Sequence, residues 1–106
     1  MQTKLLINGE LVEGAGEALP VIDPSTGEEI VRVREASAEQ VDAATRSAEE
    51  AFDYFGQTTP MARAGFLLDI AEALEANATE LAGLESLDVG KPWPSALNDE
   101  MPLTID

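Results

Sequence analysis

The sequence predicts an α/β protein in which two amino-terminal β-hairpins are followed by three or four helices. Two stretches rich in turn-forming residues, Asn8-Gly9 and Asp23 to Gly27, each separate short runs of strand-forming residues. Beyond residue 36 the apolar residues recur at helical spacing instead. We therefore expect hairpins over residues 1–35 and helices over residues 36–106, all within one domain.

The first hairpin is predicted from Lys4–Ile7 and Leu11-Val12, which flank Asn8-Gly9. Both turn residues tolerate a positive φ, and this favours a type I′ turn. Between the hairpins, Gly14-Ala15-Gly16 has only two glycines and no helix after it, so it is typical of a turn and not of a dinucleotide-binding loop.

The second hairpin is expected from Leu19–Ile22 and Glu29–Arg34, joined through the turn formers Asp23 to Gly27. In its second strand, valines at 31 and 33 alternate with arginines at 32 and 34. This alternation indicates that one face of the hairpin is shielded from water.

The helical part begins at Ser37, which with Gln40 three residues later has the spacing of a capping box. This helix is expected to end at Gly56. A second helix should start at the N-cap Thr59, with Pro60 at its first position. One apolar stripe is predicted on this second helix, formed by Phe66, Leu67, Ile70, Ala71 and Leu74.

Asn77 and Glu80 also have capping-box spacing, so a third helix is predicted from there to Gly90. A last helix is expected from about Pro94 through Met101, with a kink at Pro102 because proline cannot donate a backbone hydrogen bond.

The charge and composition exclude several function classes. With 21 acidic and 6 basic residues, the net charge of -15 argues against nucleic-acid and anionic-membrane partners. There is no Cys and no His, so thiol nucleophiles, disulfides and imidazole bases are absent. We assign no catalytic and no cofactor-binding residue. The start at Met1 lacks the regions of a signal peptide, which predicts a cytoplasmic location.

Two acidic pairs are the remaining candidates for a site. Glu85 and Asp88 fall in the last turn before Gly90, where the helix dipole disfavours negative charge. A positive group should offset them, and both Lys91 and a bound cation are open alternatives. Asp99 and Glu100 are suited to receive an amine or a cation, although solvated acid pairs are common in so acidic a chain.

Three segments in order resemble the opening of aldehyde dehydrogenases: Lys4 to Glu10, Val21 to Glu28 and Leu84 to Pro92. Ala96 to Pro102 is similar to the branch that oxidises gamma-aminobutyraldehyde, the aminoaldehyde and betaine aldehyde branch. The resemblance implies a partial cofactor-domain region of a longer, oligomeric enzyme that uses NAD or NADP. The catalytic Cys would lie outside this chain, which should be inactive alone and should pack on the remainder of its subunit or on a related subunit.

The resemblance also implies two sites. Some aldehyde dehydrogenases hold K⁺ or Na⁺ through backbone oxygens at the positions of Val21 and Ile22 and through an acid at the position of Asp88. In aminoaldehyde enzymes an acid at the position of Asp99 receives the substrate amine. Pro102 departs from the family pattern, because a second acid often stands there.

The alternative is a stand-alone, non-catalytic acidic protein, a truncated gene product that serves as a structural or interaction module. A third hypothesis is a small cation-binding module. An exposed apolar surface on the helices beyond Gly56 would favour the dehydrogenase segment, because that surface would lack its natural cover. A sealed core with a polar exterior would favour the stand-alone protein.

Overall fold

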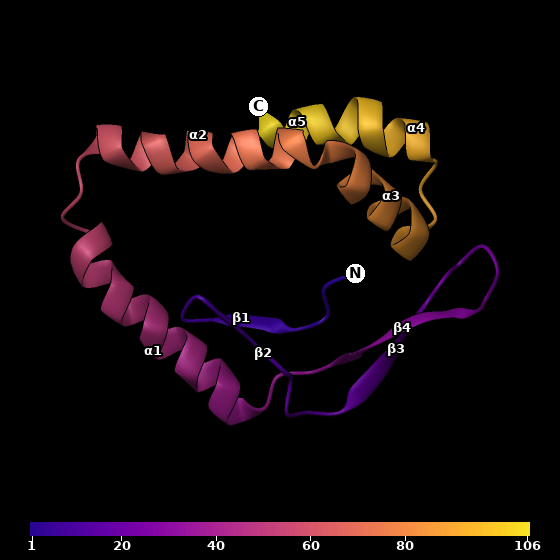
Figure 1. Ribbon diagram of the computed structural model, residues 1–106, viewed down its shortest axis with the longest axis horizontal. Helices are drawn as coiled ribbons and strands as arrows, with labels where there is room; N and C mark the ends of the chain where they lie inside the picture. The colour runs from indigo at the N-terminus through magenta and orange to yellow at the C-terminus, as the bar shows by residue number, and fades with distance from the viewer. The chain divides into compact units, whose positions relative to one another are not determined.

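A computed structural model describes all residues from Met1 to Asp106. The chain has mixed α/β structure, with two short hairpins followed by helices, and this confirms the predicted fold class (Figure 1). It divides into two compact units, Met1–Val21 with Glu29–Thr58 and Ile22–Glu28 with Thr59–Asp106. The single domain expected over residues 1–106 stays a prediction. No helix combines the length and the apolar character needed to cross a membrane.

The first unit begins with an antiparallel hairpin of β1 (Leu5–Ile7) and β2 (Glu10–Val12), in which Leu6 lies opposite Leu11. Asn8 has φ 51° and Gly9 has φ 77°, so both turn residues are left-handed. This is the backbone of a type I′ turn, as predicted.

The second hairpin pairs β3 (Ala18–Ile22) with β4 (Glu29–Arg34). In β4, Val31 and Val33 are half-buried while Arg32 and Arg34 are exposed. The predicted alternation is therefore present, although the shielded face is only partly covered.

The connection between the hairpins is a turn, as its glycine pattern predicted. Gly14 is buried, and a Cβ atom there would lie 2.3 Å from the carbonyl oxygen of Arg34. The Gly16 amide donates to the Glu35 carbonyl at 2.8 Å. Glycine is needed at position 14 because the backbone at the end of β4 leaves no room for a side chain.

Helix α1 (Ala38–Phe55) has the predicted capping box. The Gln40 amide donates to Ser37 Oγ at 3.3 Å, and the Ser37 amide donates to Gln40 Oε1 at 3.0 Å. The Gln40 side chain also accepts from the Ala15 amide and donates to the Glu13 carbonyl, both at 2.8 Å. Gln40 thus ties the start of α1 to the loop between the hairpins.

Helix α1 ends at Gly56 as predicted, but for a different reason. Gly56 is right-handed, with φ -62°, so no left-handed cap is formed. A Cβ atom at this position would lie 2.9 Å from the carbonyl oxygen of Phe52. The close approach of the backbone, and not a positive φ, is what favours glycine here.

The second unit contains α2 (Pro60–Ala76) and α3 (Ala78–Val89), which meet at a bend at Asn77 (Figure 1). Thr59 caps α2 as predicted, accepting from the Ala62 amide at 3.2 Å. The capping box predicted at Asn77 is wrong, because Asn77 makes no N-cap hydrogen bond. Its backbone is not extended (φ -112°, ψ 9°), and Nδ2 instead donates to the Ala73 carbonyl at 2.8 Å, which caps the end of α2.

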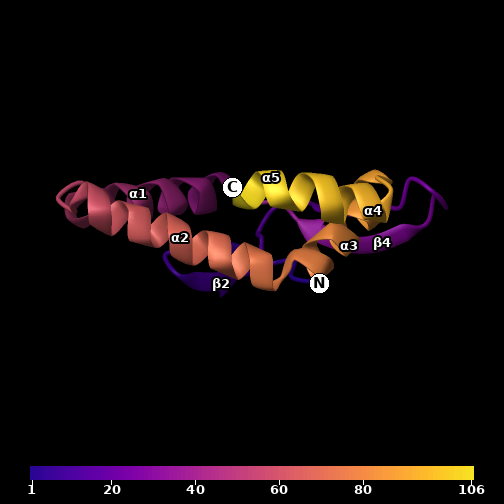
Figure 2. The same ribbon diagram turned by 90° about the horizontal axis from the view of Figure 1, so that it is seen from above.

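Helix α3 ends at Gly90, which is left-handed as predicted, with φ 73°. The last helical stretch follows as α4 (Trp93–Ser95), the π-helical η1 (Ala96–Glu100) and α5 (Met101–Ile105). Helix α5 lies alongside α2 in both views (Figures 1 and 2).

The wide turn η1 stands directly before Pro102, where the sequence predicted a kink. The Met101 amide donates to the Ala96 carbonyl, five residues back. In an α-helix the Pro102 ring would clash with the Asn98 carbonyl, which would also lack its donor. A π-helical turn before the proline relieves this conflict without breaking the helix.

The buried core is small. The buried apolar side chains are those of Ala82 in α3 and Ala96 in η1, and both lie in the second unit. Every large apolar side chain keeps some contact with solvent. Small alanines therefore mark where α3 and η1 pack most closely.

Candidate functional site

The turn after β3 is held by Asp23. Its Oδ1 accepts from the amide and the hydroxyl of Ser25, both at 2.7 Å, and its carbonyl accepts from the Gly27 amide at 2.8 Å. The hydrogen bond from the Ser25 hydroxyl, followed by that from the Ser25 amide, lowers the pKa of the Asp23 carboxyl below its ordinary value. The turn is therefore organised around an ionised carboxylate.

This turn packs against the carboxyl end of α3. A Cβ atom on Gly90 would lie 2.9 Å from Cγ of Pro24. Glycine is therefore favoured at position 90 for two reasons: the backbone has a positive φ, and the Pro24 ring leaves no room for a side chain. The contact places Pro24, which follows Ile22 and Asp23 in the chain, against the end of α3, the helix that carries Asp88.

Of the predicted cation ligands, Ile22 and Asp88 belong to the second unit and Val21 to the first. Ile22 is the exposed last residue of β3, and Asp88 is exposed in the last turn of α3. No group of three or more His, Cys, Asp or Glu side chains is arranged to hold a metal ion. The hypothesis of a K⁺ or Na⁺ site formed by backbone oxygens and Asp88 stays a prediction.

Lys91 is one of the two alternatives, beside a bound cation, for the positive group expected at the end of α3. Its Nζ lies 2.7 Å from Oε1 of Glu85 and 2.6 Å from Oε2 of Glu100. Glu100 first, and Glu85 second, raise the pKa of the Lys91 ammonium through hydrogen bonds. The Lys91 side chain is only 26% exposed, so this cluster of three charges is partly shielded.

In each of the two acidic pairs, Glu85 with Asp88 and Asp99 with Glu100, one acid has an ion pair with Lys91 and the other has none. Lys91 offsets Glu85 and has no ion pair with Asp88. Its second partner, Glu100, was missed from the sequence because the wide turn η1 brings it back to Lys91.

Asp99, the predicted residue for a substrate amine, is exposed on η1. Ser95 Oγ donates to its Oδ2 at 2.8 Å, one helical turn away. This hydrogen bond orients the Asp99 carboxylate. Its neighbour Glu100 is occupied by Lys91, so the two adjacent acids are held in different surroundings.

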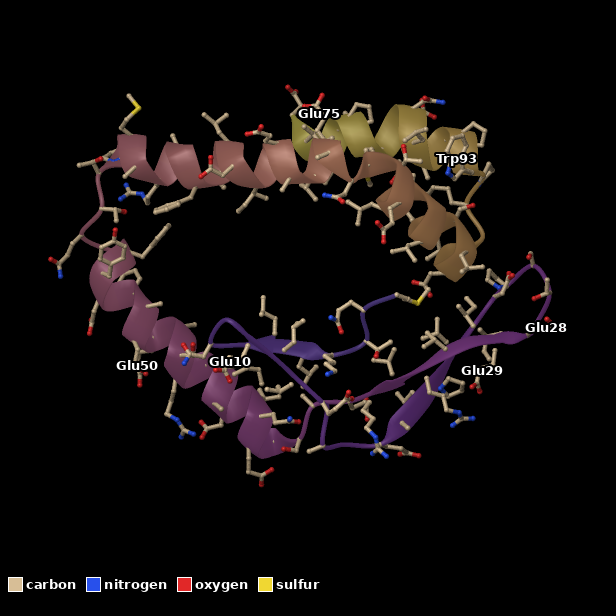
Figure 3. The ribbon with its side chains drawn as sticks, viewed as in Figure 1. Glu10, Glu28, Glu29, Glu50, Glu75 and Trp93 are labelled. Atoms are coloured by element: carbon tan, nitrogen blue, oxygen red, sulfur yellow. The ribbon has the colours of Figure 1, made fainter.

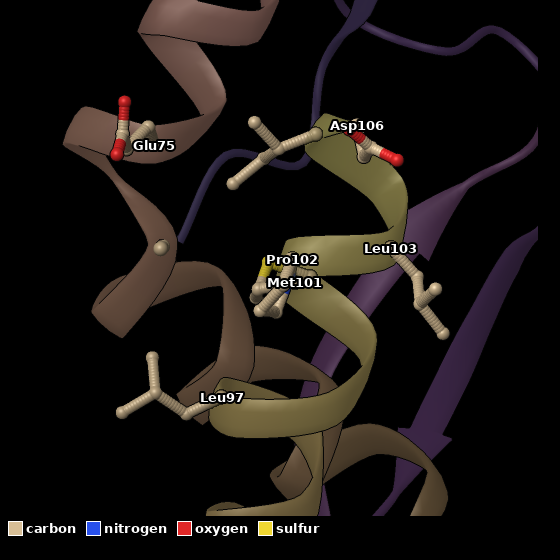
Figure 4. A pocket seen from close by; sticks show the side chains of 8 residues that line it. Glu75, Leu97, Met101, Pro102, Leu103 and Asp106 are labelled. Carbon is tan, nitrogen blue, oxygen red and sulfur yellow. The ribbon is translucent and has the colours of Figure 1, made fainter.

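A hollow of about 570 Å³ lies between the end of α2 and the last helical stretch, and the sequence did not predict it. Figure 4 shows Glu75 and Asp106 at one end and Leu97 at the other. A second hollow of about 520 Å³ lies in the first unit, between β1 and α1. Both depend on how helices pack against their neighbours, which residue spacing along one element does not reveal.

Large apolar side chains on the second unit are exposed. On the predicted stripe of α2, Phe66 is 42%, Leu67 is 68% and Ile70 is 55% exposed. Other exposed large apolar residues beyond Gly56 are Met61, Leu68, Leu87, Val89, Trp93 and Leu103. Such a surface is expected of a segment whose natural cover is absent, and it differs from a sealed core.

Comparison with known proteins identifies what the chain resembles. Residues 11–106 match the aldehyde dehydrogenase family. A mitochondrial aldehyde dehydrogenase from Leishmania tarentolae is 40% identical over 107 residues, which cover 100% of this chain and 22% of that protein.

Solved structures are similar over nearly the whole chain. PnpE in complex with nicotinamide adenine dinucleotide has a TM-score of 0.93 at 34% identity, over 99% of this chain and 22% of that one. A variant of the aldehyde dehydrogenase from Bacillus cereus has a TM-score of 0.91 at 35% identity, with coverages of 99% and 22%. The chain thus spans about a fifth of the length of these proteins.

Proposed function

Because the chain belongs to the aldehyde dehydrogenase family, we propose that it forms the amino-terminal part of a subunit that oxidises an aldehyde to its acid. The cofactor would be NAD or NADP, which accepts a hydride from the substrate. NAD is the cofactor named for one of the similar structures. The observation that carries the proposal is the exposed apolar stripe of α2.

The stripe needs a partner for energetic reasons. Phe66, Leu67 and Ile70 each leave about half of the side chain in water. Covering the exposed part of such a side chain contributes on the order of 1 kcal/mol. Three of them represent a sizeable share of the roughly 5–15 kcal/mol that stabilises a typical domain. The remainder of the subunit, or a related subunit, is the cover that we propose for this face.

The chain by itself would be inactive. It contains no Cys to act as the thiolate nucleophile. Gly14 to Gly16 form a turn bonded to Glu35 and not the start of a helix, so this turn does not fit the pyrophosphate of a dinucleotide. The role of the chain would be to complete the fold of the enzyme.

An aminoaldehyde is the substrate that we propose, with Asp99 receiving its ammonium group. The exposed carboxylate, oriented by Ser95, supports this assignment. In the active enzyme, Asp99→Asn should raise the KM for gamma-aminobutyraldehyde and leave the KM for an uncharged aldehyde of similar length unchanged. Equal effects on both aldehydes would remove Asp99 from the substrate site.

An alkali cation is a further part of the proposal, with Asp88 as its charged ligand and backbone oxygens of Val21 and Ile22 as the others. The absence of an ion pair to Asp88 supports it. At constant ionic strength, K⁺ or Na⁺ should raise the Tm relative to a large organic cation, and Asp88→Ala should abolish the difference. If the Tm does not depend on the cation in the unmodified chain, there is no site.

The experiment that tests the main proposal uses an antibody against Ser37 to Gly56, the segment of α1. Material captured from the cytoplasm of the source cells is weighed by mass spectrometry and assayed for NADH formation with several aldehydes. We expect aldehyde oxidation in the captured material, carried by a species several times heavier than 11.3 kDa. Antibody blocked beforehand with the 106-residue chain is the control.

The same experiment can also refute the proposal. A species of 11.3 kDa that brings down no dehydrogenase activity would refute the proposal. The stand-alone acidic protein would then be the better description of this chain.

A further inference from the structure

We propose that the folding of α1 and α2 depends on ionic strength, because carboxylates repel one another along these helices. The pairs lie three or four residues apart and so share a helix face. They are Glu49–Asp53 and Glu50–Asp53 in α1, and Asp69–Glu72 and Glu72–Glu75 in α2. This property is independent of the proposed enzymatic function.

Basic residues compensate few of these charges. The ion pairs of Lys4, Arg32, Arg46 and Lys91 involve five of the 21 carboxylates. Among the helical acids, Asp42 pairs with Arg46 and Glu85 pairs with Lys91. Glu50 and Glu75 are exposed, and Figure 3 shows both side chains extending away from their helices.

The position of the acids along each helix adds to the repulsion. The pairs lie in the carboxyl-terminal half of α1 and of α2, where the helix dipole disfavours negative charge. None of these helices has a basic residue in its last turn. Glu39 in the first turn of α1 and Glu80 in the first turn of α3 are well placed, and the pKa of Glu39 is lowered by hydrogen bonds from its own backbone amide and from Ser37.

Little else opposes the repulsion. The buried apolar side chains are those of Ala82 and Ala96, and α1 and α2 contain no buried residue. The helices are therefore stabilised mainly by partly shielded contacts, which oppose the repulsion within a helix less than a buried apolar face would.

The spacing of the charges sets the salt concentration at which the response should appear. Side chains three or four residues apart on a helix have Cβ atoms about 5–6 Å apart. The Debye length is about 10 Å at 0.1 M salt and about 3 Å at 1 M. Screening between neighbours therefore becomes effective only above several tenths molar, so we expect helix content to rise between about 0.1 and 1 M salt. This is a response to the ionic atmosphere and not to a bound cation.

The test is circular dichroism of the 106-residue chain in rising KCl, NaCl and tetramethylammonium chloride. We expect the helical signal to rise in all three salts, tetramethylammonium chloride included, and to stay unchanged in sucrose. A salt-independent signal would refute the proposal, and so would an equal rise in sucrose, because excluded co-solvents strengthen apolar burial without screening charge.

Two variants separate helix repulsion from net charge. The first, E50Q/D53N/E72Q/E75Q, removes four acids from α1 and α2 and should be helical at low salt, with most of the salt response lost. The second, E10Q/E17Q/E28Q/E35Q, removes four exposed acids from outside the helices, among them Glu10 and Glu28 at the hairpin turns (Figure 3). It should keep the response. An equal loss of response in both variants would assign the effect to net charge and refute the role of helix placement.

Discussion

Gly90→Ala tests the contact that brings the turn after β3 to the end of α3. An alanine with a left-handed backbone is strained by about 1–2 kcal/mol. Its Cβ would also lie 2.9 Å from Cγ of Pro24, closer than carbon atoms normally approach. Overpacking of this kind costs typically 1–3 kcal/mol. We therefore expect Gly90→Ala to lower the free energy of unfolding by about 3 kcal/mol.

Gly27→Ala is the matched control. Gly27 has nearly the same φ, 75° against 73°, but a Cβ atom there would meet nothing within 4 Å. This variant should therefore lose only the strain of the left-handed backbone, about 1–2 kcal/mol. The difference between the two variants isolates the effect of the Pro24 ring.

The assay is urea unfolding in high salt, followed by circular dichroism and by the fluorescence of Trp93, the only tryptophan. Pro24→Ala removes Cγ, so in a Pro24→Ala background Gly90→Ala should cost no more than Gly27→Ala. Equal losses for Gly90→Ala and Gly27→Ala in the unmodified chain would contradict the contact between Pro24 and α3.

Three further predictions follow from local contacts. Ser37→Ala should lower the free energy of unfolding by about 1 kcal/mol. Gln40→Ala should lower it by roughly 2–3 kcal/mol, because this variant also loses two hydrogen bonds to the loop between the hairpins. Equal losses of unfolding free energy in urea would contradict this difference. The pKa of the Asp23 carboxyl, measured by NMR titration, should lie below the ordinary aspartate value, and Ser25→Ala should raise it. A carboxyl whose pKa is lowered by folding stabilises the folded state at neutral pH, and this stability is lost as the pH falls through the folded pKa. The turn should therefore weaken only in acid. Lys91→Met should speed hydrogen exchange over residues 96–101 and Lys91→Arg should restore protection, whereas unchanged exchange in Lys91→Met would show that its ion pairs do not order η1.

Most local structure could be predicted because it depends on residues close together in the chain. The type I′ turn needs only Asn8-Gly9, and the caps of α1 and α2 need only Ser37 with Gln40 and Thr59 with Pro60. In each case the hydrogen bonds or φ values that define the feature are formed within four residues. The family resemblance could be stated for the same reason, since the segments that carry it are contiguous.

The failed prediction at Asn77 has a physical cause. The spacing of Asn77 and Glu80 suits a capping box, but an N-cap residue must be extended to direct its side chain at the next turn. Here α2 runs almost directly into α3, so Asn77 is not extended and caps the preceding helix instead. Competition between two adjacent helix ends for one side chain cannot be judged from spacing.

The sequence alone determined the order of strands and helices, where most of them begin and end, the excess of negative charge, and the absence of a thiol nucleophile, because each depends on residue type and short-range spacing. Tertiary structure decided which groups from different elements meet: Gln40 with the loop at Glu13 and Ala15, Pro24 with Gly90, and Lys91 with Glu100. It also decided that Phe66, Leu67 and Ile70 on the apolar stripe of α2 stay exposed. These contacts join residues that are distant in the chain, and only the packing of complete helices and turns brings such residues together.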